Sequence, residues 1–139
     1  MAEGAFRAAA SKVGLEVSID SVGTASYHIG DSPDPRAVAV AAQHGVDIST
    51  LRGRQLAKED FARFTHIIAL DTANMAGIKS RAPRGSTAQL SLLLDVQDGT
   101  SGASVADPYY GDESDFASCW AQIVEATEKL AEQLKADNP

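Results

Sequence analysis

Apolar and polar positions along the chain follow two spacings, one typical of helices and one typical of buried strands. Apolar runs at 17–20, at 65–71 and within 89–96 predict strands, and the run at 65–71 has the continuous apolar centre of a strand buried on both faces. Short strands alternating with helices are typical of an α/β domain with a parallel sheet. The helices are predicted over 2–13, 35–44, 58–64 and 72–80, with a last one after the loop 97–113.

The last predicted helix has the clearest apolar stripe. Its apolar side chains recur at alternating three- and four-residue steps, so one face is expected to pack on the core. These positions are Phe116, Trp120, Ile123, Thr127, Leu130 and Leu134.

The pattern opens on a helix that no strand precedes, whereas an α/β domain normally begins its first helix after a strand and loop. In such domains this loop and the N-terminus of the helix commonly bind a ligand together. We therefore expect that the chain is a single domain over 1–139 that lacks its first strand and the loop after it.

The charge balance disfavours anionic partners. The chain has 19 acidic and 12 basic residues, a formal net charge of −7, so we expect neither nucleic acid nor a membrane surface as a partner. Its one cysteine cannot form an internal disulfide, and the histidines at 28, 44 and 66 are too scattered to suggest a zinc site. These features predict a reduced, cytoplasmic protein without metal or cofactor.

The segment DPYYGDESDF (107–116) carries the most specific chemistry. Pro108 biases Asp107 toward an extended conformation, and two tyrosines follow. A carboxylate held beside aromatic rings is a plausible general acid, because partial desolvation raises its pKa toward neutrality. The alternative is a helix-capping loop with two surface tyrosines, in which Asp112 or Ser114 supplies the cap.

Four segments together carry a resemblance to a known family. DPYYGDESDF resembles the general-acid loop of low-molecular-weight protein tyrosine phosphatases. MAEGAFR (1–7) is similar to the helix after that family's phosphate-binding loop, and DSVGTASYHIGDSPDPRA (20–37) to the loop that walls its pocket. RQLAKEDFARF (54–64), followed by a strand ending at Asp71, resembles the family's central stretch.

The resemblance implies a three-layer α/β fold whose parallel sheet has four strands in the family, the first being absent here. It implies metal-free hydrolysis of phosphotyrosine proteins or small aryl phosphates through a cysteinyl-phosphate. In this chain Asp107 would be the general acid, and Tyr27, Tyr109 and Tyr110 would line the substrate ring. Ser21 would support the phosphate-binding loop.

The chain departs from the family at the nucleophile. The family's cysteine is followed six positions later by an arginine, whereas Cys119 is followed by Glu125 and sits mid-helix beside Trp120. A thiol there has neither a phosphate cradle nor an electropositive setting, so we expect a buried structural cysteine and an inactive chain. Two alternatives stay open: a non-catalytic pseudophosphatase that binds or assembles with partners, and a phosphoarginine phosphatase of the same family.

Four further positions have structural interpretations. Asp34 and Arg36 are expected to form a local ion pair or to brace the loop, and His44 to end a helix. Asp71 either caps the next helix or supports the phosphate-binding loop.

Without a first strand, the edges of 17–20 and 65–71 would be unpaired, which predicts a homodimer or larger oligomer through these edges.

Overall fold

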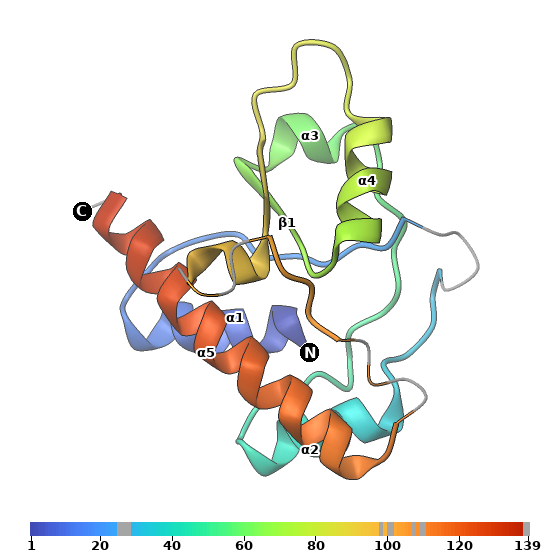
Figure 1. The fold of residues 1–139 in the computed structure, drawn as a ribbon, viewed down its shortest axis with the longest axis vertical. Helices are drawn as coiled ribbons and strands as arrows, with labels where there is room; N and C mark the ends of the chain where they lie inside the picture. The colour runs from blue at the N-terminus through green and yellow to red at the C-terminus, as the bar shows by residue number, and fades with distance from the viewer. Residues whose placement is uncertain (25–28, 98, 100–101, 107, 109–110, 138–139) are drawn as a thin grey trace.

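A computed structural model describes residues 1–24, 29–97, 99, 102–106, 108 and 111–137 of the chain. It confirms an α/β fold in which helices cover a small parallel sheet (Figure 1). The helices are α1 (Ala2–Lys12), α2 (Pro35–Gln43), α3 (Asp60–Arg63), α4 (Thr72–Arg81) and α5 (Glu113–Asp137); the strands are β1 (His66–Ala69) and β2 (Gln89–Leu92), and a 3-10 turn η1 (Leu93–Val96) follows β2.

The two strands separate two apolar layers. β1 and β2 pair in parallel, with His66 opposite Gln89 and Ala69 opposite Leu92. Because side chains alternate along a strand, Ile67 packs in the cluster under α3 and α4, whereas Ile68 packs against the larger core formed with α1, α2 and α5. Figure 1 shows α5 running along α1 and α2 on one side of β1, with α3 and α4 on the other. The three-layer arrangement is therefore confirmed.

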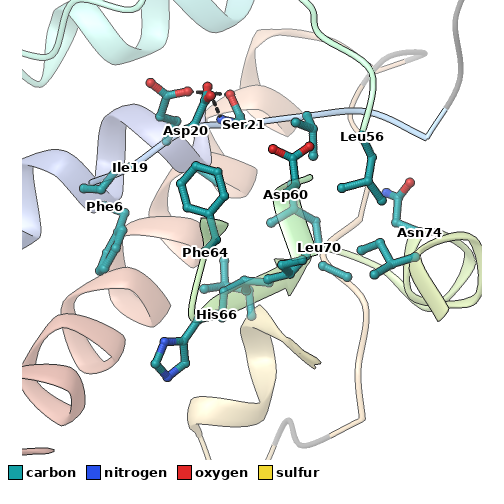
Figure 2. Close-up of a pocket in the computed structure, with 18 of the residues that line it drawn as sticks. Phe6, Ile19, Asp20, Ser21, Leu56, Asp60, Phe64, His66, Leu70 and Asn74 are labelled. Atoms are coloured by element: carbon teal, nitrogen blue, oxygen red, sulfur yellow. Dashed lines mark hydrogen bonds between the residues drawn. The ribbon is translucent and has the colours of Figure 1, made fainter. Parts of the chain in front are cut away.

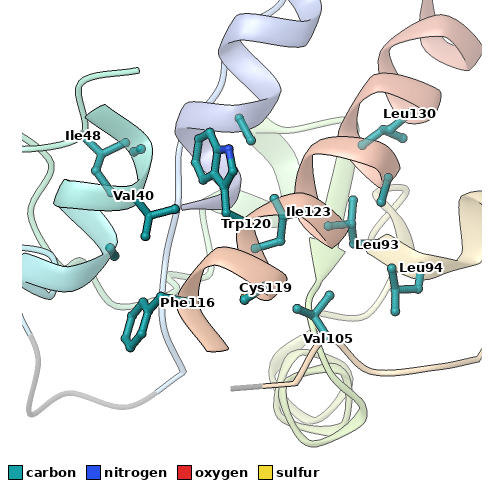
Figure 3. Packing of buried hydrophobic residues seen from close by; sticks show 14 residues of the cluster. Val40, Ile48, Leu93, Leu94, Val105, Phe116, Cys119, Trp120, Ile123 and Leu130 are labelled. Atoms are coloured by element: carbon teal, nitrogen blue, oxygen red, sulfur yellow. The ribbon is translucent and has the colours of Figure 1, made fainter. Parts of the chain in front are cut away.

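The predicted stripe on α5 packs into the larger core. Phe116, Trp120, Ile123, Thr127 and Leu130 are all buried, and Leu134 packs at the edge (Figure 3). Each fully buried large apolar side chain contributes about 1.5–3 kcal/mol to stability.

Close packing of α1 on the chain after α2 depends on a glycine. A Cβ on Gly4 would lie 2.5 Å from Cγ2 of Ile48 and 2.9 Å from Cγ1 of Val46. Ile48 is fully buried, so it has no free space into which it could withdraw. The backbone of α1 reaches this position only because residue 4 has no side chain.

Local polar contacts fix where three helices begin. The Asp34 side chain accepts the Arg36 N–H at the start of α2, and Asp71 accepts the Asn74 N–H at the start of α4, at 2.8 and 2.6 Å. Asp112 accepts the Ser114 N–H before α5 at 3.0 Å. Each bond satisfies a donor that the helix itself leaves open. The capping roles predicted for Asp71 and Asp112 are confirmed.

Two predicted strands differ from the structure. Residues 17–20 form no strand, because a strand needs a hydrogen-bonded neighbour and no backbone hydrogen bond joins them to β1 in the described ranges. The strand predicted within 89–96 ends at Leu92, where Asp95 accepts the N–H groups of Leu92 and Gly102 and turns the chain into η1.

Within the described residues, no helix is both long and apolar enough to cross a membrane.

Candidate functional site: two polar networks and a groove

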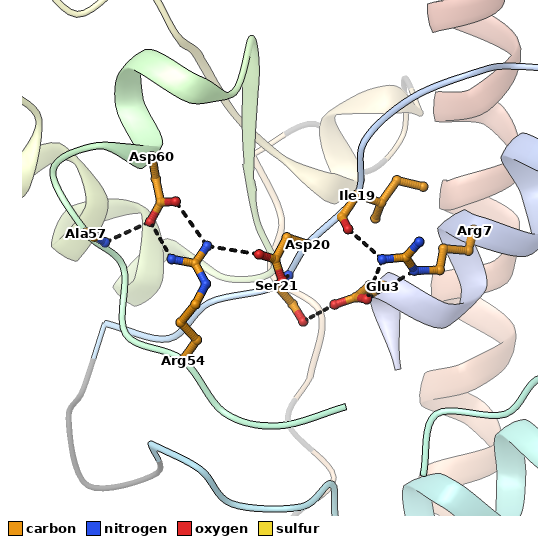
Figure 4. A network of polar contacts seen from close by, with 8 residues as sticks. All are labelled: Glu3, Arg7, Ile19, Asp20, Ser21, Arg54, Ala57 and Asp60. Atoms are coloured by element: carbon orange, nitrogen blue, oxygen red, sulfur yellow. Dashed lines mark hydrogen bonds and ion pairs between the residues drawn. The ribbon is translucent and has the colours of Figure 1, made fainter. Parts of the chain in front are cut away.

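Ser21 belongs to a hydrogen-bonded network that joins α1 to the segment after it. Its Oγ donates to Oε1 of Glu3 at 2.5 Å, and Glu3 is buried (Figure 4). Arg7 donates from Nε and Nη2 to the other carboxylate oxygen of Glu3, and from Nη2 to the Ile19 carbonyl at 2.6 Å. The network therefore holds residues 19–21 against the first two turns of α1.

Glu3 and Arg7 were missed by the sequence analysis as site residues. Their four-residue spacing is that of an ordinary helix ion pair, which is common on exposed helix faces. Nothing in this local spacing marks Glu3 as the buried acceptor for a hydroxyl 18 residues away.

A second network reaches the same segment from the opposite side. Arg54 donates from Nη1 and Nη2 to the two carboxylate oxygens of Asp60, both at 3.0 Å, and forms an ion pair with Asp20 at 3.2 Å. Asp60 also accepts the Ala57 N–H at 2.8 Å. The hydrogen bond with Asp60 raises the pKa of Arg54. Burial acts to raise the pKa of Asp60, but hydrogen bonds from Arg54 and Ala57 outweigh it, so this pKa is lowered.

A groove of about 290 Å³ lies between residues 17–24 and β1. Figure 2 shows Ile19 and Ser21 on one side of it and His66 and Leu70 on the other. Side chains from both apolar layers line it, including Phe6, Leu56, Ile78, Leu130 and Leu134. Asp20 and Ser21, which the two polar networks hold, lie at its rim.

Arg36 ties α2 to the segment that resembles a general-acid loop. Its guanidinium pairs with Asp34 at 2.9 Å, as predicted, and donates from Nη1 to the Gly111 carbonyl at 3.0 Å. It also lies over the Phe116 ring, 4.4 Å from the ring centre. The side-chain hydrogen bond from Arg36 lowers the pKa of Asp34. Because the Pro108 carbonyl accepts the Gly111 N–H at 2.8 Å, this brace also reaches Pro108.

Of the five predicted site residues, only Ser21 lies within the described part of the chain. Tyr27, Asp107, Tyr109 and Tyr110 lie outside the described residues.

Cys119 is buried on α5, as predicted, with 8% of its surface exposed. His44, which ends α2, stacks on Trp120 with ring centres 5.6 Å apart. Cys119 therefore belongs to the core, whereas His44 is exposed and covers Trp120 from the solvent side.

The chain resembles known phosphatases over its whole length. Residues 1–139 match the family model described as low molecular weight phosphotyrosine protein phosphatase. The enzyme of that name from Schizosaccharomyces pombe is 35% identical over 137 residues, covering 96% of this chain and 87% of the relative, and the one from Saccharomyces cerevisiae is 40% identical over 128 residues, covering 88% and 79%. A crystal structure of a protein tyrosine phosphatase from Entamoeba histolytica superposes with a TM-score of 0.90 at 27% identity, covering 99% of this chain and 89% of that one. The chain belongs to the low molecular weight phosphotyrosine protein phosphatase family.

Proposed function

We propose that this chain contributes the residues that bind and protonate the leaving group in a site that hydrolyses aryl phosphates. Asp107 protonates the departing phenol oxygen and later takes a proton from the attacking water, while Tyr27, Tyr109 and Tyr110 hold the substrate ring. The brace of Arg36 on Gly111 carries this proposal, since a general acid must be held within hydrogen-bond reach of its proton acceptor. Family membership supports the reaction class.

In this family reaction a cysteine thiolate attacks phosphorus, and the P–O bond to the phenol breaks as Asp107 gives up its proton. Water then attacks the cysteinyl-phosphate and releases inorganic phosphate and the thiolate. Only a thiolate is nucleophilic enough for the first step, and a cationic neighbour stabilises it.

We propose that the 139 residues by themselves do not complete this reaction. Cys119, the sole cysteine, lies on α5 and is buried in the hydrophobic core. The residue six positions later is Glu125, an anionic side chain that cannot bind a phosphate group as the family's arginine does.

Ser21 is proposed to support a phosphate-binding loop as an acceptor. A serine hydroxyl has one proton to donate and two lone pairs that accept. The Ser21 hydroxyl donates a hydrogen bond to Glu3, which orients its oxygen to accept a hydrogen bond from a backbone N–H group. Glu3 thereby acts as the positioning residue for Ser21.

The first test is hydrolysis of para-nitrophenyl phosphate by the 139-residue chain. We expect no turnover above buffer, because Asp107 alone supplies no nucleophile. Turnover that survives repurification and the substitution Cys119→Ser would contradict the proposed inactivity.

The second test restores the reaction by placing a family-like strand and Cys-containing loop ahead of Met1. Asp107→Asn should then slow substrates with poor leaving groups by about 10²–10⁴-fold, with a smaller loss for leaving groups that need no proton. Glu113→Gln, which removes an exposed carboxylate at the start of α5, is the matched control and should have little effect. Equal losses for both kinds of leaving group would make Asp107 structural.

The restored protein also separates the alternatives. Preference for phosphoarginine over phosphotyrosine would identify a phosphoarginine phosphatase. No turnover of either substrate by the folded, restored protein would favour a binding or assembly module.

A further inference from the structure

One stretch of the chain is basic although the chain as a whole is acidic. Residues 72–94 contain Lys79, Arg81 and Arg84 and no acidic residue, in a chain whose formal net charge is −7. All three basic residues are exposed, at the end of α4 and in the turn that follows it. They define a basic segment, residues 79–87.

A turn directly after α4 holds one of these cations at its tip. Pro83 disfavours helical backbone at Ala82, so the helix does not continue past that residue. The Ser86 N–H then donates to the Pro83 carbonyl at 3.2 Å. The third residue of this turn, Gly85, has a φ of +79°, a conformation that glycine adopts without strain. Arg84 is thereby placed at the second position of the turn.

Both ends of the turn are anchored in the fold, whereas its tip is uncovered. Ala82 and Ala88 pack in the apolar cluster under α3 and α4. Residues 84–87 between them are all exposed. Figure 1 shows this part of the chain projecting beyond α3 and α4 before it returns to β2. A partner can therefore reach Arg84 without displacing another element.

The charges of the basic segment are not neutralised within the fold. In the part of the chain that the structure describes, no acidic side chain forms an ion pair with Lys79, Arg81 or Arg84. The dipole of α4 favours cations in its last turn, which accounts for Lys79 and Arg81. Arg84 lies beyond the helix, and neither the dipole nor an ion pair accounts for it.

The basic segment lies at the far end of α4 from the chain that precedes Asp107. The Val105 N–H donates to the Leu70 carbonyl at 2.7 Å, and the Ser104 hydroxyl accepts the Thr72 N–H at 3.0 Å, both at the start of α4. The 10 residues of α4 span about 15 Å at 1.5 Å per residue. A partner on the basic segment would leave residues 104–105 uncovered.

We propose that the basic segment binds a short acidic segment of another protein. Residues two apart on a helix do not face each other, so Lys79 and Arg81 cannot converge on one small anion. An extended peptide with several carboxylates can instead pair with the three cations one by one. This inference does not depend on the proposed hydrolysis of aryl phosphates.

The acidic remainder of the chain disfavours larger polyanions. Charges interact over about 8–10 Å at physiological ionic strength. A nucleic acid or an anionic membrane extends further than this and would meet the excess acidic residues outside the basic segment, which repel it. A short peptide contacts the basic segment alone.

The test uses the 139-residue chain and a rhodamine-labelled peptide, Gly-Glu-Asp-Glu-Asp-Glu-Gly, blocked at both ends. Fluorescence anisotropy at about 0.01 M salt, where surface charges are least screened, should show saturable one-to-one binding. The same peptide with Gln and Asn in place of Glu and Asp should not bind. Absence of saturable binding at millimolar acidic peptide would overturn the proposal.

Charge reversals locate the binding surface. Arg84→Glu should weaken binding about fivefold, since an exposed attraction is replaced by a repulsion of similar size, and adding Arg81→Glu should weaken it further. Lys129→Glu makes the same charge change at an exposed position of α5, on the other side of β1, and should change binding less than about twofold. Equal losses in Arg84→Glu and Lys129→Glu would mean that only the overall charge matters, and the site would be wrong.

Two other anions test the class of partner. A single-stranded DNA oligonucleotide with as many charges as the peptide, and vesicles that contain an anionic phospholipid, should both bind more weakly than the peptide. Tighter binding of either one, lost in Arg84→Glu, would assign the surface to nucleic acid or to membranes and overturn the proposal.

Light scattering tests a second copy of the chain as the rival occupant. The homodimer predicted through the strand edges does not involve the basic segment, so Arg84→Glu should leave the size of the particle unchanged. An oligomer that Arg84→Glu converts to monomers would show that the basic segment binds an acidic surface of its own kind, and the proposal would be wrong.

Discussion

Replacing Asp60 by asparagine should destabilise the chain by about 2 kcal/mol. Asp60 is 5% exposed, and its carboxylate accepts two hydrogen bonds from Arg54 and one from the Ala57 N–H. Asn keeps one acceptor oxygen and turns an NH₂ group toward the guanidinium. The variant thus loses at least one charge-assisted hydrogen bond, each of which contributes about 1.5–3 kcal/mol. The Arg54 side chain is 36% exposed, and this contact with water places the loss near the lower end of that range.

Urea unfolding at neutral pH measures this loss, and its pH dependence tests the cause. The pKa of Asp60 is lowered in the folded state, so the carboxylate contributes stability above its unfolded pKa, and this contribution disappears as pH falls through the folded value. Asn does not titrate. The difference between the two proteins should therefore shrink below about pH 4, the usual aspartate pKa.

The matched control is Glu59→Gln, which removes the same charge from the neighbouring exposed position. We expect it to change the free energy of unfolding by less than about 0.5 kcal/mol. A loss of that small size in Asp60→Asn, or a larger loss that does not depend on pH, would refute the argument from the ion pair.

Two further substitutions test contacts that position α1 and the 107–116 segment. Gly4→Ala should destabilise the chain by about 1–2 kcal/mol despite the better helix propensity of alanine, because its Cβ would meet Ile48 at 2.5 Å; a rise in melting temperature would contradict this. Arg36→Lys should cost about 1–2 kcal/mol, since lysine cannot pair with Asp34 through two donors while also stacking on Phe116. Its effect should be less than additive with that of Asp34→Asn in urea unfolding, and strict additivity would show that the two side chains act separately.

The helices could be predicted closely from the sequence because their signals are local. The stripe on α5 repeats over several turns, and α2 and α4 begin at aspartates that cap them. These signals depend on residues within one or two turns of each other, and the structure places the helices within a residue or two of the predicted bounds.

The strand at 17–20 and the polar networks could not be predicted in the same way. An apolar run favours a strand, but a strand forms only where a neighbour offers hydrogen bonds, and this depends on distant residues. The contact of Ser21 with Glu3 likewise depends on how α1 packs. Asp107, Tyr27, Tyr109 and Tyr110 were assigned through the family resemblance, and their roles stay predictions.

The stack of Trp120 on His44 determines what tryptophan fluorescence reports in this protein. Trp120 is the sole tryptophan and is 3% exposed, so indole emission arises from one buried position between α5 and the end of α2. Its spectrum will report when these two helices separate.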